Sequence, residues 1–214
     1  MAGEMTAHPN SPSAPPLTER QEARRRRILD ATARLARRGG FGAVQMREVA
    51  ESSDVALGTL YRYFPSKVHL LVATMHDRLE RLHGTLHRHP PQEPEPAARV
   101  AGTLMRAFRA LQREPHLAEA MVRAFTFADR SVSAEVDAVS RLTTAIILDA
   151  MGQEAGREGP PSPERLSVVR VIEHTWHSTL IGWLSGRAST EQVREDIETV
   201  CGLIGAAPPG GARR

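Results

Sequence analysis

Residues 46–64, MREVAESSDVALGTLYRYF, decide the fold of the N-terminal part of the chain. Counted from Met46, the fifth position is Ala50, which is small enough to let two helices approach closely. The ninth position is Asp54, a residue type that tolerates turn conformations. Apolar side chains that can fix the crossing angle follow at Val49, Val55, Leu60 and Tyr63. This spacing predicts a helix-turn-helix, a unit whose second helix enters the major groove of DNA.

The second helix of this unit, residues 57–63, carries the candidate DNA-reading side chains. Leu60 has to face inward, which turns its neighbours outward. A glycine lets the helix come close to the bases, a threonine can touch a base edge or a thymine methyl, and tyrosine hydroxyls suit phosphates. We therefore predict DNA contacts from Arg47, Gly58, Thr59, Tyr61, Arg62 and Tyr63. The aromatic residues could instead belong to a small core, which we expect for Phe64 and in part for Tyr63.

Positive charge surrounds the predicted motif. Pro65-Ser66-Lys67 begins the next helix, with Ser66 as its N-cap, and the free amides there together with Lys67 suit one phosphate. The net charge is only +3, yet eight arginines lie between Arg20 and Arg38 against two acidic residues. This cluster indicates a polyanionic partner, with a solvated helix face as the alternative.

Composition favours an all-helical protein of the cytoplasm. The 214 residues are 41% apolar and only 4% aromatic, and few apolar runs alternate with period two, so a large sheet is not expected. Cys201 is the single cysteine, which excludes an internal disulfide and fits a reducing compartment. No stretch approaches 18 apolar residues and no signal peptide is recognisable, so we expect neither export nor a membrane span.

Helical periodicity divides the chain into two domains and two tails. We expect disordered tails at 1–18 and 206–214, a helix-turn-helix domain at 19–67 and a second domain at 68–205. Gly39-Gly40 predicts the end of the first helix, and Pro-rich or Gly-rich segments at 89–96 and 156–163 predict loops. About nine helices result, three in the first domain and six in the second. The helices around Trp176 and over 193–204 have more apolar surface than one subunit needs, which predicts a dimer, with intramolecular core as the alternative.

Residues 24–71 resemble the N-terminal domain of the TetR family of bacterial regulators, above all in the segment GTLYRYFPSK at 58–67. Shorter motifs at 44–47, 66–71, 127–129, 135–137, 183–184 and 187–189 are similar to the members of that family that repress cholesterol catabolism in actinobacteria. The Pro-rich tail and the loop at 90–96 depart from that pattern.

The resemblance implies a homodimer, joined through the last two helices of each subunit, that binds an inverted repeat in double-stranded DNA. It also implies a cavity in the second domain where a small-molecule effector, here a steroid acyl-CoA, releases the DNA. Candidate cavity residues are Leu104, Phe108, Met121, Phe125, Ile146 and Trp176, each of which can equally be core. Arg99, Arg106, Arg109 and Arg113 share one side of their helix and could meet the CoA phosphates, although a solvated face is the simpler interpretation. A fatty acyl-CoA, a drug or a signalling lactone remains an alternative effector.

An enzyme is the main rival class, and the sequence does not favour it. The chain has no Gly-rich phosphate loop, no nucleophile elbow and no carboxylate pair at a distinctive spacing. His83 with His87, or His174 with His177, could in principle hold a metal, but no acidic or cysteine ligand follows at a telling spacing. We predict no enzymatic activity, no cofactor and no metal site.

Overall fold

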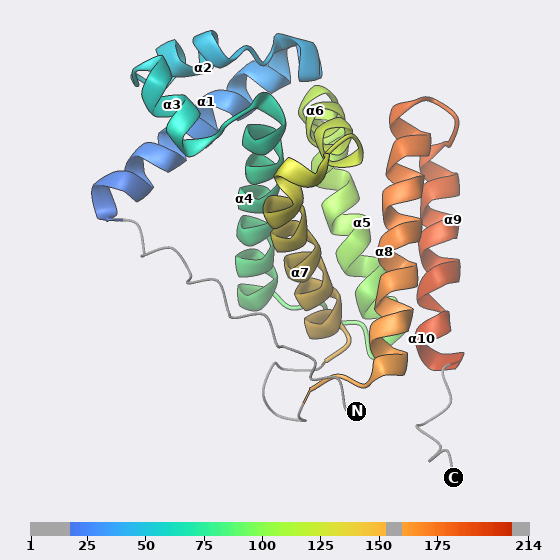
Figure 1. Cartoon of the computed structure of the whole chain (residues 1–214). Helices are drawn as coiled ribbons and strands as arrows, with labels where there is room; N and C mark the ends of the chain where they lie inside the picture. Colours follow the sequence, from blue (N-terminus) through green and yellow to red (C-terminus); the bar gives the residue numbers. More distant parts are fainter. Residues whose placement is uncertain (1–17, 153–159, 207–214) are drawn as a thin grey trace, which may run out of the picture.

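The computed structural model describes residues 18–152 and 160–206, so the predicted tails lie almost wholly outside it, as does part of the predicted loop at 156–163. Within those residues every regular element is helical, as the sequence predicts (Figure 1). The helices are α1 (Glu19–Ala43), α2 (Met46–Ser52), α3 (Leu57–Tyr63), α4 (Lys67–Arg88), α5 (Pro96–Arg113), α6 (Pro115–Thr126), α7 (Ser133–Ala150), α8 (Pro163–Leu184), α9 (Thr190–Cys201) and the short α10 (Leu203–Ala206), with a 3₁₀ turn η1 (Arg130–Val132) before α7.

Local sequence signals set the ends of α1. Thr18 and Gln21 form a capping box, in which each side chain pairs with the other residue's backbone N–H. At the other end Gly39 and Gly40 leave the helical conformation, and Gly40 has a φ of 64°, which favours glycine. The predicted stop is therefore confirmed, and a last turn to Ala43 leads into α2.

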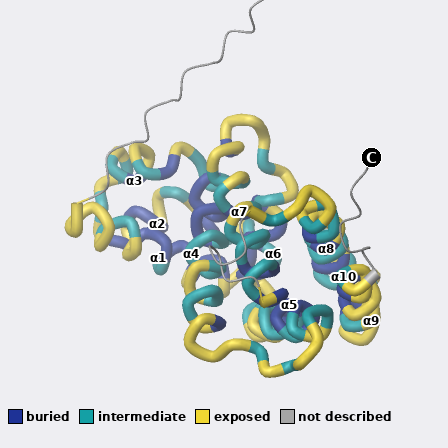
Figure 2. The backbone as a smooth tube through the Cα atoms, turned by 90° about the horizontal axis from the view of Figure 1, so that it is seen from below, coloured by how far each residue is buried: buried dark blue, intermediate teal, exposed yellow. Residues whose placement is uncertain are grey.

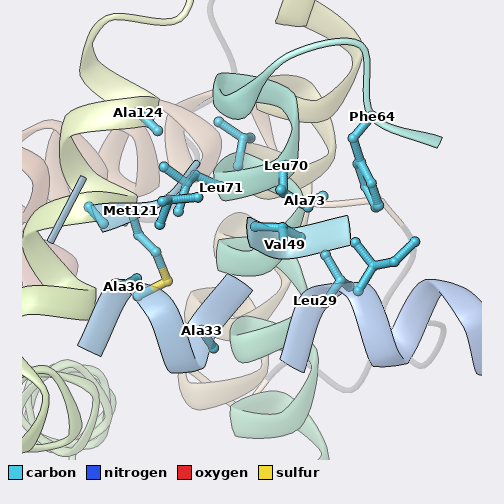
Figure 3. Close-up of a cluster of buried hydrophobic side chains, with 14 of the residues drawn as sticks. Leu29, Ala33, Ala36, Val49, Phe64, Leu70, Leu71, Ala73, Met121 and Ala124 are labelled. Atoms are coloured by element: carbon cyan, nitrogen blue, oxygen red, sulfur yellow. The ribbon is translucent and has the colours of Figure 1, made fainter. Parts of the chain in front are cut away.

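One apolar cluster joins the three N-terminal helices to the rest of the molecule. Leu29 of α1, Val49 of α2 and Phe64 after α3 meet Leu70 and Leu71 of α4 (Figure 3). Met121 and Ala124 of α6 belong to the same cluster, next to Ala33 and Ala36 of α1. The N-terminal helices are thus packed directly against α4 and α6, so a shift of either helix can be transmitted to them.

A second cluster lies among α5, α7, α8 and α9, whose inner sides are buried (Figure 2). Phe108 of α5 is fully buried and meets Trp183 of α8 edge to face, with 5.0 Å between the ring centroids. Val193 and Ile197 of α9 are fully buried in this cluster. The apolar stripe of α9 is therefore core of a single subunit, contrary to our expectation that it was surplus surface.

Apolar surface remains on other helices near the C-terminal end. Val171 of α8 and Leu203 of α10 are each 44% exposed, and Leu166 is 39% exposed. The periodic stripe that the sequence predicts to Ile204 is divided at Gly202, between the end of α9 and the short α10. Over the described residues, the helices lack any apolar run long enough to cross a membrane.

Candidate DNA-binding surface and apolar cavity

The turn between α2 and α3 has the geometry that the spacing predicts. Asp54 takes a φ of 53°, the left-handed conformation that its position requires. Val55 N–H donates to the carbonyl of Ala50 over 3.0 Å, and the Ser53 hydroxyl donates to the carbonyl of Val49 over 2.6 Å. Ala50 is buried, so the two helices meet at a small side chain. The turn is therefore rigid and holds α3 at a fixed angle to α2.

Helix α3 has one buried anchor and an open outer face. Leu60 is fully buried, while Gly58, Tyr61 and Arg62 are exposed, Tyr61 to 46%. Thr59 and Tyr63 are half-buried, and Tyr63 also packs against the cluster of Figure 3. Arg47, on the first turn of α2, is exposed as well. The predicted DNA-reading residues thus lie on two consecutive short helices, with Tyr63 partly used for packing.

Lys67 is held by the end of α1 rather than left free. Its Nζ donates to the carbonyl of Phe41 over 3.1 Å and lies 4.1 Å from the centroid of the Phe41 ring. Burial lowers the pKa of Lys67, and the nearby charge of Arg123 lowers it further. Ser66 caps α4 as predicted, since its Oγ accepts from the N–H of His69. The ammonium group has three N–H donors and uses one of them on the Phe41 carbonyl, so a phosphate contact from Lys67 would use another.

The arginines of α1 divide between structural contacts and open surface. Arg34 donates to the carbonyl of Ser52 at the end of α2, and Arg37 forms an ion pair with Glu114 over 2.9 Å. Arg20, Arg26 and Arg27 are exposed on the first turns of α1. The part of α1 before the core thus presents positive charge to solvent, which fits both a polyanionic partner and a solvated helix face.

A cavity of about 390 Å³ lies behind the N-terminal helices, among α4, α5, α6, α7 and α8. Its walls are mostly apolar and include Met75, Leu79, Leu82, Leu104, Ala107, Leu111, Leu117, Met121, Val122, Ile146, Ile147, Trp176 and Leu180. Four of the six residues predicted from sequence line it, namely Leu104, Met121, Ile146 and Trp176. A cavity of this volume and lining suits an apolar ligand.

The structure places the other two predicted cavity residues elsewhere. Phe108 packs on Trp183 in the second cluster, and Phe125 meets His177 edge to face at 5.3 Å. Neither is among the lining residues. Helical periodicity places Phe108 and Phe125 on the same inward stripes as Leu104 and Met121, but cannot say which inward residues face a void and which face another helix.

The cavity wall also contains polar residues that the sequence patterns did not single out. Arg78, Thr103 and Arg113 contribute to its wall, as do Arg81 and Glu114. Among the described residues, Nε of Arg78 and Oγ1 of Thr103 are buried without a hydrogen-bond partner. A buried polar atom without a partner costs free energy, so these two residues are the polar positions of the wall at which a further hydrogen bond would be most favourable.

The arginine stripe predicted on α5 has a mainly structural use. Arg99 donates to the carbonyls of Ala150 and Met151 at the end of α7, over 2.9 and 2.8 Å. Arg106 donates to the carbonyl of His89 over 3.1 Å, and Arg109 is exposed. Of the four, Arg113 is the one that lines the cavity.

Helix α6 connects the cavity to the end of α1. Met121 lines the cavity, while Glu119 of the same helix accepts a hydrogen bond from the N–H of Phe41 over 2.8 Å. The guanidinium of Arg123 lies 4.8 Å from the Phe41 ring centroid. These contacts join positions 78 and 82 residues apart, so no local pattern in the sequence reveals them.

Comparison with known proteins agrees with this geometry. Residues 28–74 match the family model for bacterial regulatory proteins of the tetR family, and residues 93–204 match the model for a tetracyclin repressor-like C-terminal domain. The chain is 47% identical over 184 residues to the HTH-type transcriptional repressor KstR of Rhodococcus jostii, covering 86% of this chain and 84% of that protein. It is 43% identical over 187 residues to KstR of Mycobacterium tuberculosis, covering 87% and 83%.

Solved structures share the fold. A TetR transcriptional regulator from Rhodococcus sp. RHA1 superposes with a TM-score of 0.80 at 36% identity, covering 87% of this chain and 97% of that one. FadR of Thermus thermophilus, a TetR family repressor solved in complex with lauroyl-CoA, gives a TM-score of 0.67 at 18% identity, covering 88% and 97%. The named relatives are transcriptional regulators rather than enzymes, which confirms the class that the sequence predicts. The chain belongs to the TetR family of bacterial transcriptional regulators.

Proposed function

We propose that this protein is a dimeric repressor that leaves its DNA operator when an acyl-CoA with a large apolar acyl group, derived from a sterol, enters the cavity. The observation that carries the proposal is an apolar cavity whose wall contains polar atoms without hydrogen-bond partners. Two of the helices that form this cavity, α4 and α6, pack directly against the helix-turn-helix domain, so a ligand that moves them can change the DNA-reading surface.

The operator is an inverted repeat in double-stranded DNA, read by α3 of each subunit. Base and phosphate contacts come from Arg47, Gly58, Thr59, Tyr61, Arg62 and Tyr63, with Lys67 at a phosphate beside the start of α4. Two recognition helices have to lie about 34 Å apart to enter successive major grooves. Subunits join along α8 and the C-terminal helices, where the exposed Val171 and Leu203 supply apolar surface that supports such an interface.

The cavity suits a ligand with an apolar body and a polar group near one end. Leu104, Met121 and Ile146 contact the apolar body, and Trp176 offers a broad ring surface to it. Arg78 and Thr103 donate to a carbonyl such as that of a thioester, which gives their unpaired atoms a partner. The CoA nucleotide is too large for the remaining space and stays outside, where the exposed Arg113 offers positive charge, while Arg81 is paired with Asp30 and Asp77.

Two helices carry the effect of the ligand to the DNA-reading surface. Helix α6 lines the cavity with Met121 and holds the end of α1 through Glu119. Helix α4 lines the cavity with Met75 and Leu79 and begins three residues after α3 ends. A ligand that pushes α4 or α6 outward changes the separation of the two recognition helices, and a small pivot is enough to lose the major-groove fit.

The sterol-derived effector rests on the resemblance to repressors of cholesterol catabolism and on the identity to KstR over most of the chain. A fatty acyl-CoA is the second candidate, since the same fold holds lauroyl-CoA in the Thermus thermophilus protein. Both effectors share the thioester and the nucleotide. They differ in the acyl group, so the experiment has to vary that group alone.

Fluorescence anisotropy of a labelled duplex from upstream of the gene tests the proposal. We expect salt-sensitive binding that is abolished by a steroid acyl-CoA and not by free CoA at the same concentration. Release by lauroyl-CoA and not by the steroid thioester would replace the sterol by a fatty acid. Binding no tighter than to a random duplex would contradict the DNA half of the proposal.

The variant Thr103→Val tests the part of the proposal that concerns ligand binding. Valine has nearly the shape of threonine, and the buried hydroxyl has no partner in the described structure, so the variant should fold with equal or greater stability and operator binding should be unchanged. Loss of one hydrogen bond to the ligand should raise the effector concentration needed for release by about 2- to 12-fold. An unchanged requirement would remove Thr103 from the ligand site.

A further inference from the structure

Two histidines and an aspartate converge at the end of the molecule opposite the DNA-reading helices. The C-terminal ends of α4 and α7 lie side by side there (Figure 1). One ligand atom each from His83, His87 and Asp149 lies within 4.8 Å of the other two. The two histidines are one turn apart on α4, and the carboxylate comes from α7, 66 positions after His83. The third ligand that the sequence did not reveal is therefore supplied by the fold.

Hydrogen bonds orient the two imidazole rings toward the carboxylate. Nδ1 of His87 lies 3.0 Å from the carbonyl of His83, and a carbonyl only accepts, so Nδ1 carries the proton. In the neutral ring this leaves Nε2, 3.6 Å from Oδ2 of Asp149, as the nitrogen with a free lone pair. His83 Nε2 lies 2.6 Å from the same oxygen. A backbone hydrogen bond that fixes the distal nitrogen as ligand is the usual outer shell of a metal-bound histidine.

Two of the three separations between ligand atoms can be compared with those of a zinc site, and the two histidine nitrogens, within 4.8 Å of each other, have to take the same spacing. With bonds of about 2.0–2.2 Å, neighbouring ligand atoms of a tetrahedral zinc ion lie about 3.4 Å apart. The 3.6 Å between His87 and Asp149 fits this value as it stands. The 2.6 Å between His83 and Asp149 has to open by about 0.8 Å, within the reach of side-chain rotation, while His83 moves its proton from Nε2 to Nδ1.

The surroundings hold the site in place and leave it open to solvent. Arg99 donates to the carbonyls of Ala150 and Met151 and so holds the backbone next to Asp149. Its positive charge offsets the negative dipole at the end of α7, so the charge that attracts a cation is that of the Asp149 carboxylate. The side chain of His87 is 59% exposed, so an ion can enter from solvent.

We propose that His83, His87 and Asp149 bind a zinc ion, with a fourth position open to water. Thr85, which lies between the two histidines on α4, and Ile146, one turn before Asp149, both line the apolar cavity. The ion therefore joins two walls of the cavity at their ends. It stabilises the folded chain and restricts the separation of α4 and α7 on which entry of an effector depends.

Cobalt(II) titration of the metal-free, tag-free full chain tests the site. We expect the visible absorption of a four-coordinate cobalt ion, saturating at one ion per protomer and abolished by zinc. Zinc at 100 times its dissociation constant should also raise the thermal midpoint by on the order of 5 °C. The absence of both signals in the wild-type chain would leave an ordinary His–Asp ion pair and overturn the proposal.

Variants separate this site from adventitious metal binding. His87→Ala is chosen first because the side chain is largely exposed and its loss should leave the metal-free thermal midpoint unchanged. His87→Ala and Asp149→Asn should both lose the cobalt spectrum and the zinc-induced midpoint shift. His89→Ala, at the end of the same helix and outside the cluster, is the control and should keep both. Binding that persists in His87→Ala and Asp149→Asn would refute the assignment.

Discussion

Replacing Gly58 by alanine should make the protein more stable and at the same time weaken its hold on DNA. Gly58 lies on the exposed face of α3, and a Cβ built there has no atom within 4 Å. Alanine exceeds glycine in helix propensity by up to about 1 kcal/mol, so the free energy of unfolding should rise by about 0.5–1 kcal/mol. The folded subunit itself therefore gives no reason for glycine at this position.

DNA supplies the reason if α3 reads the major groove as proposed. The added methyl group would stand between the helix and the bases, and disruption of one base contact costs about 1–3 kcal/mol, or roughly 5- to 150-fold in operator affinity. Urea unfolding and fluorescence anisotropy on the same preparation measure the two effects. Gly84→Ala is the matched control, because it adds a methyl group to the interior of α4, whose nearest contact is 3.8 Å away, and should gain stability without losing affinity. Operator affinity of Gly58→Ala within twofold of the wild type would refute the placement of α3 against the bases.

Three further changes test the packing. Leu60→Ala should lower the free energy of unfolding by about 2–5 kcal/mol, because Leu60 is fully buried, and operator binding should fall with it; urea unfolding and anisotropy measure the two. Gly40→Ala should lower the free energy of unfolding, measured in urea, by about 2.5–5 kcal/mol. Alanine would have to adopt the left-handed φ of Gly40, and its Cβ would lie 2.4 Å from Oε2 of Glu119, so that the hydrogen bond between Glu119 and α1 must break. A decrease below 1 kcal/mol would contradict this. Burial raises the pKa of Glu173 above its ordinary 4.5, so the folded chain holds this proton more tightly than the unfolded chain does. The folded chain therefore loses stability as the pH rises from 4.5 through the raised pKa. Glu173→Gln, which keeps an acceptor for Thr144, should therefore be more stable than the wild type at pH 7, with a difference that closes below about pH 4.5; a difference independent of pH in thermal unfolding would be the contrary result.

Local sequence patterns predicted what depends on neighbours in the chain. The spacing from Ala50 through Asp54 to Leu60 predicted the helix-turn-helix, and the structure places the turn, the positive φ and the buried anchor at those positions. The stop at Gly39-Gly40 and the cap at Ser66 are likewise determined by residues within one helical turn. Such features follow from backbone conformation and hydrogen bonding of a few adjacent residues.

Contacts between distant helices were beyond the reach of those patterns. Periodicity identifies the inward face of a helix and leaves open which helix, or which void, that face meets. The apolar stripe of α9 thus suggested a dimer interface and is core, and Phe108 suggested a cavity wall and packs on Trp183. The joining of Glu119 to Phe41 and of Asp149 to His83 depends on the three-dimensional fold, since each pair is more than 60 positions apart.

In the proposed mechanism, occupation of the cavity and binding of the operator oppose each other. Thermodynamic linkage requires the two effects to be equal, so if the effector weakens operator binding by some factor, the operator must weaken effector binding by the same factor. Isothermal titration of the steroid acyl-CoA into free protein and into operator-saturated protein measures this directly. We predict a loss of effector affinity in the presence of operator that matches, within error, the loss of operator affinity in the presence of effector. Equal effector affinity with and without operator would contradict the account.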